Sequence, residues 1–126
     1  MSHAVDVTVE TLDEKTTPEI VAVLTDLLGD PIPGNTLDSL TLTYYQEYTQ
    51  AIINGRDAQN ALQANGVTVD ANGKLVWKMS VLDTAILNDA LETEPHIAHF
   101  VFAYPDGADT VVGSETIRIP VRNTRA

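Results

Sequence analysis

The residues whose types and spacing are best suited to chemistry are a glutamate and two histidines, Glu94, His96 and His99. On a helix, histidines three positions apart share one face and could bind zinc together. On a strand they point to opposite faces, and only Glu94 and His96 lie on the same side. The aromatic and β-branched run at residues 100–104 predicts a strand. We therefore expect no joint metal site, and a histidine hydrogen-bonded to a neighbour instead.

Other patterns typical of catalysis are missing from the sequence. The chain has no cysteine, which excludes a disulfide, a thiolate zinc site and a cysteine nucleophile. No serine stands in a Gly-x-Ser-x-Gly context, and no glycine-rich loop suits a phosphate. The acidic residues beside Asn72-Gly73 and Asp106-Gly107 lack the ligand number and loop length of a calcium-binding EF-hand. We expect a protein that is not an enzyme and uses no metal or cofactor.

The charge balance argues against two classes of partner. Seven Lys and Arg stand against 18 Asp and Glu, giving a net charge of −11. Binding to a nucleic-acid backbone requires clustered cations, and an anionic membrane surface would repel this chain. No apolar run approaches the ~20 residues that span a bilayer, and the first residues do not resemble a signal peptide. We expect no nucleic acid and no membrane among the partners.

The elements that must position these residues follow a period of two, which is typical of strands. Alternation at residues 5–9, 40–45, 74–79, 99–104 and 116–122 predicts five strands. Residues 18–24 fit either a short helix with proline at its first position or a buried, β-branched strand. We expect the strand, because Gly29 and the proline turn that follows leave little room for three helical turns. A short helical turn is expected at residues 82–87, capped by Asp83 and crossing between sheets.

Turn residues separate these runs. Four Asn-Gly or Asp-Gly pairs, a strong hairpin signal, begin at Asn54, Asn65, Asn72 and Asp106. Strands at this spacing predict an all-β, immunoglobulin-like β-sandwich of about 7–9 strands with one short helical turn. We expect a single domain overall, with an N-terminal strand or arm at residues 1–15 and the sandwich at residues 16–126.

Two groups of residues are candidates for an interaction surface. Tyr44 and Trp77 are in phase with core leucines, so Tyr45 and Tyr48 are the better surface aromatics. The N-terminal strand is a candidate for exchange between subunits, and Pro120 in the last strand suggests an edge or bulge. The C-terminal cations either dock a neighbouring subunit or pair with acidic residues of the same molecule. The candidate set is Val5, Val7, Val9, Tyr45, Tyr48, Arg118, Arg122 and Arg125.

The order of the segments also resembles a known class of protein. The segments are residues 24–26, 29–34, 37–45, 52–60, 73–77, 83–86 and 94–102. Together they resemble small Ig-like proteins of tailed bacteriophages over about residues 20–122, and more distantly the N-terminal sandwich of phage baseplate upper proteins. The resemblance supplies no catalytic residues.

This resemblance implies a structural component of a virion, in the neck, tail, baseplate or capsid surface (as a decoration protein). Such a protein is assembled in the host cytoplasm and acts as a homo-oligomer that contacts other virion proteins. The alternative is an Ig-like recognition module that binds a glycan or the host surface through Tyr45, Tyr48 and the Asn-Gly loops.

Overall fold

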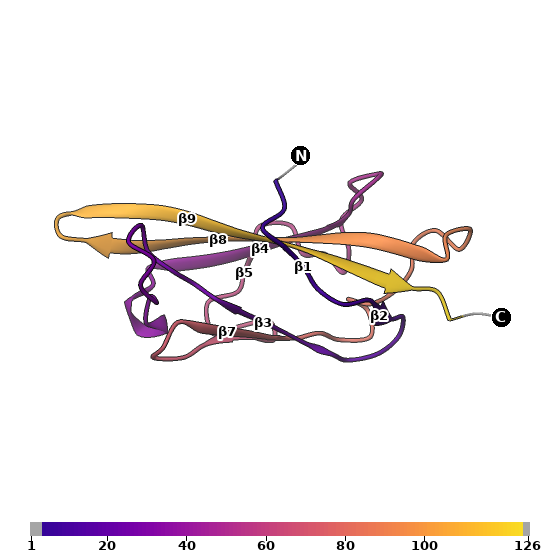
Figure 1. The fold of residues 1–126 in the computed structure, drawn as a ribbon, viewed down its shortest axis with the longest axis horizontal. Helices are drawn as coiled ribbons and strands as arrows, with labels where there is room; N and C mark the ends of the chain where they lie inside the picture. Colours follow the sequence, from indigo (N-terminus) through magenta and orange to yellow (C-terminus); the bar gives the residue numbers. More distant parts are fainter. Residues whose placement is uncertain (1–3, 125–126) are drawn as a thin grey trace.

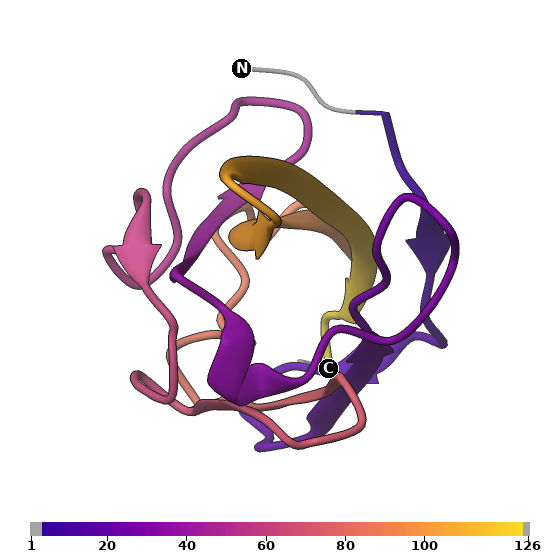
Figure 2. The same cartoon turned by 90° about the vertical axis from the view of Figure 1, so that its left-hand side faces the viewer.

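The computed structural model describes residues 4–124, which form a β-sandwich of two sheets (Figures 1 and 2). The larger sheet has the order β1-β9-β8-β4-β5, with β2 also paired to β9, and the smaller sheet has the order β3-β7-β6. The larger sheet contains β1 (Val7–Thr8), β2 (Leu12–Asp13), β4 (Ser39–Gln46), β5 (Gln59–Asn60), β8 (Thr93–Asp106) and β9 (Asp109–Arg122). The smaller sheet contains β3 (Glu19–Val23), β6 (Val67–Val69) and β7 (Lys74–Lys78). These nine strands confirm the predicted all-β sandwich.

The core lies between the two sheets because alternate residues of each strand point inward. Leu40, Leu42 and Tyr44 of β4 are fully buried, as is Trp77 of β7. The Tyr44 and Trp77 rings meet edge to face with their centroids 5.0 Å apart, and the ring centroids of Phe100 and Trp77 are 6.0 Å apart. The prediction that Tyr44 and Trp77 belong to the core is confirmed.

The longest element is the hairpin of β8 and β9, whose pairing runs without a break from Thr93↔Arg122 to Asp106↔Asp109. Gly107 adopts a φ of 66° in the two-residue turn, where a residue with a β-carbon would be strained. Asn72-Gly73 likewise joins paired strands, β6 and β7. The pairs at Asn54 and Asn65 turn the chain within longer connections instead.

Residues 4–14 form an arm whose strands β1 and β2 pair with β9 of the same chain, and Figure 2 shows this arm at the edge of the larger sheet. The predicted strand at residues 5–9 is observed as the shorter β1, and the parallel pairing resumes in β2. Pro120, which has no N–H to donate, lies opposite the gap between β1 and β2. The unbroken register with β8 shows that Pro120 does not mark a bulge.

The ambiguous run at residues 18–24 contains strand β3, paired antiparallel to β7, as predicted. Residues 79–92 cross between the sheets as expected, but the helical turn predicted at residues 82–87 is wrong. The carboxylate of Asp83 accepts hydrogen bonds from Ser80 N and from Arg56, which hold this segment in a non-helical turn. Within residues 4–124, the short helical element is the 3-10 helix η1 (Gly34–Thr36), and no helix there is long and apolar enough to cross a membrane.

Candidate functional site

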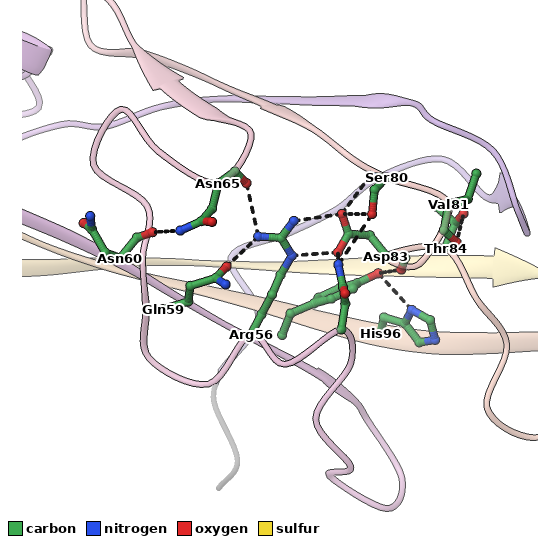
Figure 3. A network of polar contacts seen from close by, with 11 residues as sticks. Arg56, Gln59, Asn60, Asn65, Ser80, Val81, Asp83, Thr84 and His96 are labelled. Carbon is green, nitrogen blue, oxygen red and sulfur yellow. Dashed lines mark hydrogen bonds and ion pairs between the residues drawn. The ribbon is translucent and has the colours of Figure 1, made fainter.

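A buried ion pair between Arg56 and Asp83 links the segment between β4 and β5 to the segment between β7 and β8 (Figure 3). Arg56 donates from Nε to Asp83 Oδ1 over 2.6 Å and from Nη2 to Oδ2 over 3.0 Å. Its remaining nitrogen, Nη1, donates to Gln59 Oε1 and to the carbonyl of Asn65. Positive φ angles at Asn54 and Gly55 turn the chain so that the Arg56 side chain enters the protein. All three guanidinium nitrogens of Arg56 therefore donate hydrogen bonds within the molecule.

Asp83 is fully buried and is held as a carboxylate by its neighbours. Burial opposes ionisation, but hydrogen bonds from Arg56, Asn54 and Ser80 overcome this effect and lower the pKa of Asp83. The Arg56 guanidinium also lies over the ring of Trp77, 5.3 Å from its centroid. Trp77 Nε1 is buried without a hydrogen-bond partner among the described residues.

A second buried chain of hydrogen bonds joins Tyr44, His96 and Glu94. The Tyr44 hydroxyl lies 2.9 Å from His96 Nδ1 and 2.8 Å from the carbonyl oxygen of Asp83. His96 Nε2 lies 2.6 Å from Glu94 Oε1, and because an ionised carboxylate only accepts, Nε2 is the donor. The sequence-based expectation that Glu94 and His96 share a face is confirmed, whereas His99 points to the other face and bonds to Thr116.

The order hydroxyl, imidazole and carboxylate has the form of a nucleophile, a base and an orienting acid. All three side chains, however, are fully buried in the interior. Burial raises the pKa of Tyr44 and lowers the pKa of His96, which makes the hydroxyl a poor nucleophile. Burial also opposes ionisation of Glu94, but hydrogen bonds from Leu87 N, His96 and Asn88 N lower its pKa. This arrangement cross-links β4, β8 and the crossing segment, and a substrate has no access to it.

The predicted surface tyrosines separate in the structure. Tyr45 is 2% exposed, so the expectation that it lies at the surface is wrong. Tyr45 pairs with Ile97 on the face of the larger sheet that points away from the core. Both faces of this part of β4 are therefore covered, which alternation alone does not reveal. Tyr48, at 68% exposed, is at the surface as predicted.

Arg118 and Arg122, near the C-terminus, form ion pairs within the molecule. Arg118 binds Glu47 with two hydrogen bonds of 2.8 and 2.9 Å, and this pair is partly exposed. Arg122 of β9 binds Asp13 of β2. Of the two interpretations of the C-terminal cations, these contacts favour pairing with acidic residues of the same molecule. Arg125 lies outside the described residues.

The candidate valines lie along β9 in the N-terminal arm. Val7 is 43% exposed, while Val5 is half-buried and Val9 packs against the core. The structure thus brings the arm, Arg118 and Arg122 together at β9, and places Tyr48 next to Glu47 on the connection after β4.

A pair of leucines at the surface was missed by sequence reasoning. Leu27 and Leu28 are 82% and 87% exposed in the turn that follows β3. The carboxylate of Asp26 fixes this turn by accepting hydrogen bonds from Leu28 N and Asp30 N. The turn borders a pocket of about 300 Å³ that is also lined by Tyr104. Adjacent leucines between Asp26 and Gly29, outside any alternating run, were the available signal.

Potential ligands for a metal do not gather in the part of the chain that is described: no group of three His, Asp or Glu side chains there could hold an ion. No family model matches the sequence, and no curated protein matches it either. Among solved structures, the chain is similar to the N-terminal domain of phage TP901-1 ORF48 at 15% identity and a TM-score of 0.42. The similarity covers 91% of this chain and 83% of that domain.

Proposed function

We propose that this chain is a non-enzymatic structural component of a tailed-phage virion that acts through contacts with copies of itself and with other virion proteins. The virion setting is supported by the resemblance of residues 20–122 to small Ig-like phage proteins. The mode of action is supported by the positions of the charged and the apolar side chains in the molecule. Arg56 is paired with Asp83 in the interior, and Arg118 is paired with Glu47 at the partly exposed surface. Leu27 and Leu28, by contrast, are exposed to solvent.

The observation that carries the proposal is the fixed turn of Leu27 and Leu28. Burying a leucine side chain contributes about 1.5–3 kcal/mol, so two leucines in water represent a large unused contribution to binding. The hydrogen bonds to Asp26 hold the turn in one conformation, which reduces the entropy lost when a partner binds. A preformed apolar projection of this kind is typical of a protein-protein contact.

The alternative, a glycan-binding module, required two neighbouring surface aromatics. Tyr45 is buried, and Tyr48 is the exposed aromatic residue among residues 4–124. A sugar would therefore have one ring to stack on, and the structure adds no observation in favour of this alternative.

The test is the native mass of the purified protein across concentrations, measured by light scattering after size exclusion. The wild type is expected to form a discrete oligomer, and the double variant Leu27→Asp/Leu28→Asp is expected to be monomeric at the same concentrations. The matched control, Leu82→Asp/Leu87→Asp, changes leucines that are 61% and 48% exposed in another segment and should associate like the wild type. A wild-type monomer at every concentration, or equal loss in both double variants, would contradict the proposal.

A further inference from the structure

Along its first half, β9 has a hydrogen-bonding edge that no strand among residues 4–124 occupies, here called the free edge. Even-numbered residues of β9 direct their backbone groups away from β8, since Thr116 O accepts from Asp6 N and Arg118 O accepts from Val9 N. The alternation of a strand places the backbone groups of Thr110, Val112 and Ser114 on the same side. Along this part of β9 the described residues provide no second strand, because the hydrogen bonds between the arm and β9 begin only at Thr116.

Within residues 109–115, the protection of this edge is limited to the charges of Asp109 and Glu115 at its ends. Natural proteins shield an edge strand with lysine, proline or a bulge. Residues 109–115 contain no lysine or proline, and their register with β8 is unbroken. Thr110, Val112 and Ser114 are all exposed, with Val112 at 66%. The edge is therefore open to another strand.

Asp6 marks where the free edge ends. Its carboxylate accepts a hydrogen bond from Thr116 N over 2.7 Å, and its own N–H donates to Thr116 O. Burial and the nearby charge of Asp6 raise the pKa of Glu115. Neither Asp109 nor Glu115, at the two ends of the free edge, has an ion-pair partner within residues 4–124. A cation close to either end would thus be attracted.

The charges disfavour a second copy of this chain as the occupant. A two-fold antiparallel pairing that uses the whole free edge would place Val112 opposite its own copy. In that register Asp109 of each chain lies opposite Glu115 of the other chain, so the interface contains two such pairs of like charges. Like charges directly opposite one another destabilise a strand pair. The geometry instead favours a strand whose ends are basic.

We infer that the free edge of β9, residues 109–115, accepts an extended segment of a different protein, which adds as a strand and places Lys or Arg opposite Asp109 and Glu115. Backbone hydrogen bonds provide the affinity, and the acidic ends select the partner and its register. This inference deepens the proposed function by naming a surface and a partner chemistry. It does not depend on Leu27 and Leu28, so the two proposals can fail separately.

The test uses a fluorescently labelled peptide as long as residues 109–115, with alternating valine and threonine and a lysine at each end. Binding is measured by fluorescence anisotropy, and the control peptide carries glutamate at both ends. The lysine peptide is expected to bind, with an affinity that falls as the salt concentration is raised. The glutamate peptide is expected not to bind. Absence of lysine-peptide binding, or equal binding of both peptides, would overturn the inference.

Matched variants locate the binding site. Val112→Pro removes one outward N–H at an edge position where proline is tolerated, and Val112→Thr retains it. The proline variant should weaken binding by about tenfold, the order of one backbone hydrogen bond, and the threonine variant should bind like the wild type. Thermal melts confirm that both variants are folded, and equal binding by folded Val112→Pro would overturn the inference. Leu27→Asp/Leu28→Asp should bind the peptide normally.

A charge reversal gives a second, independent readout. Asp109→Lys converts both repulsive pairs of the two-fold arrangement into attractive ones, so this variant should self-associate through β9 more strongly than the wild type. Adding Val112→Pro to Asp109→Lys should remove the gain. Sedimentation velocity measures both effects, and an unchanged association constant for Asp109→Lys would contradict the stated role of charge.

Discussion

Replacing Arg56 by methionine should destabilise the protein far more than the same change at Arg118. Met retains much of the apolar stem of Arg56 but removes the charge that faces Asp83, whose side chain is fully buried. Ser80 and Asn54 still donate to the Asp83 carboxylate, but no positive charge remains beside it. Removing one partner of a buried ion pair costs about 3–5 kcal/mol in the free energy of unfolding.

Arg118 provides a control of the same geometry. It also binds its carboxylate, Glu47, with two hydrogen bonds, but the two side chains are 38% and 31% exposed. An ion pair in contact with water contributes up to about 1 kcal/mol, so Arg118→Met should have a small effect. The two variants therefore separate the effect of burial from the effect of hydrogen-bond geometry.

The assay is urea unfolding followed by the fluorescence of Trp77, the single tryptophan of the chain. At a slope of about 2 kcal/mol per molar urea, Arg56→Met should lower the midpoint by roughly 2 M and Arg118→Met by less than about 0.5 M. The double variant Arg56→Met/Asp83→Leu should be more stable than Arg56→Met alone, because it removes the unpaired charge. Equal midpoint shifts for the two single variants would refute the assignment of the buried pair as the main electrostatic link.

Two further outcomes follow from the interior. The urea midpoint should fall as the pH is lowered, because the pKa values of His96, Glu94 and Asp83 are lowered in the folded protein and the unfolded chain therefore binds protons more readily. The loss of stability should begin below the ordinary His pKa of 6.5 and steepen below the ordinary Glu and Asp pKa values of 4.5 and 3.8. A midpoint that is constant from pH 7 to 4 would contradict this expectation. Gly34→Ala should lower the free energy of unfolding by about 1–3 kcal/mol, because the new β-carbon would clash with the backbone carbonyl of Val69. The neighbouring exposed Asn35→Ala should change the free energy of unfolding by less than about 0.5 kcal/mol. Equal effects of the two changes in thermal melts would argue against the close packing at Gly34.

The strands of this protein could be predicted where one face is buried and the other is exposed. Alternation located β4 and β7 and placed Tyr44 and Trp77 in the core. It failed for Tyr45, because a second apolar contact with Ile97 covers the other face of the sheet. Periodicity reports the side of a strand on which a residue lies, and does not report what covers that side.

Contacts between distant residues could not be predicted from local patterns. Arg56 and Asp83 are 27 positions apart, in connections without periodicity, and no motif links them. Asp83 has a residue type suited to a helix cap, but its carboxylate binds a distant guanidinium instead. The free edge of β9 is likewise a property of the pairing, since it depends on where the N-terminal arm begins to pair.

Amide hydrogen exchange, resolved by residue, tests most directly whether contacts form at the exterior and leave the buried network unchanged. In dilute protein, Thr110, Val112 and Ser114 should exchange fast while Val111, Gly113 and Glu115, whose N–H groups face β8, exchange slowly. Association should protect residues 26–30, the lysine peptide should protect the three edge amides, and the residues around Asp83 and His96 should not change. Protection at Asp83 and His96, with none at residues 26–30 or at the β9 edge, would contradict a function through external contacts and would indicate that the interior is the binding site.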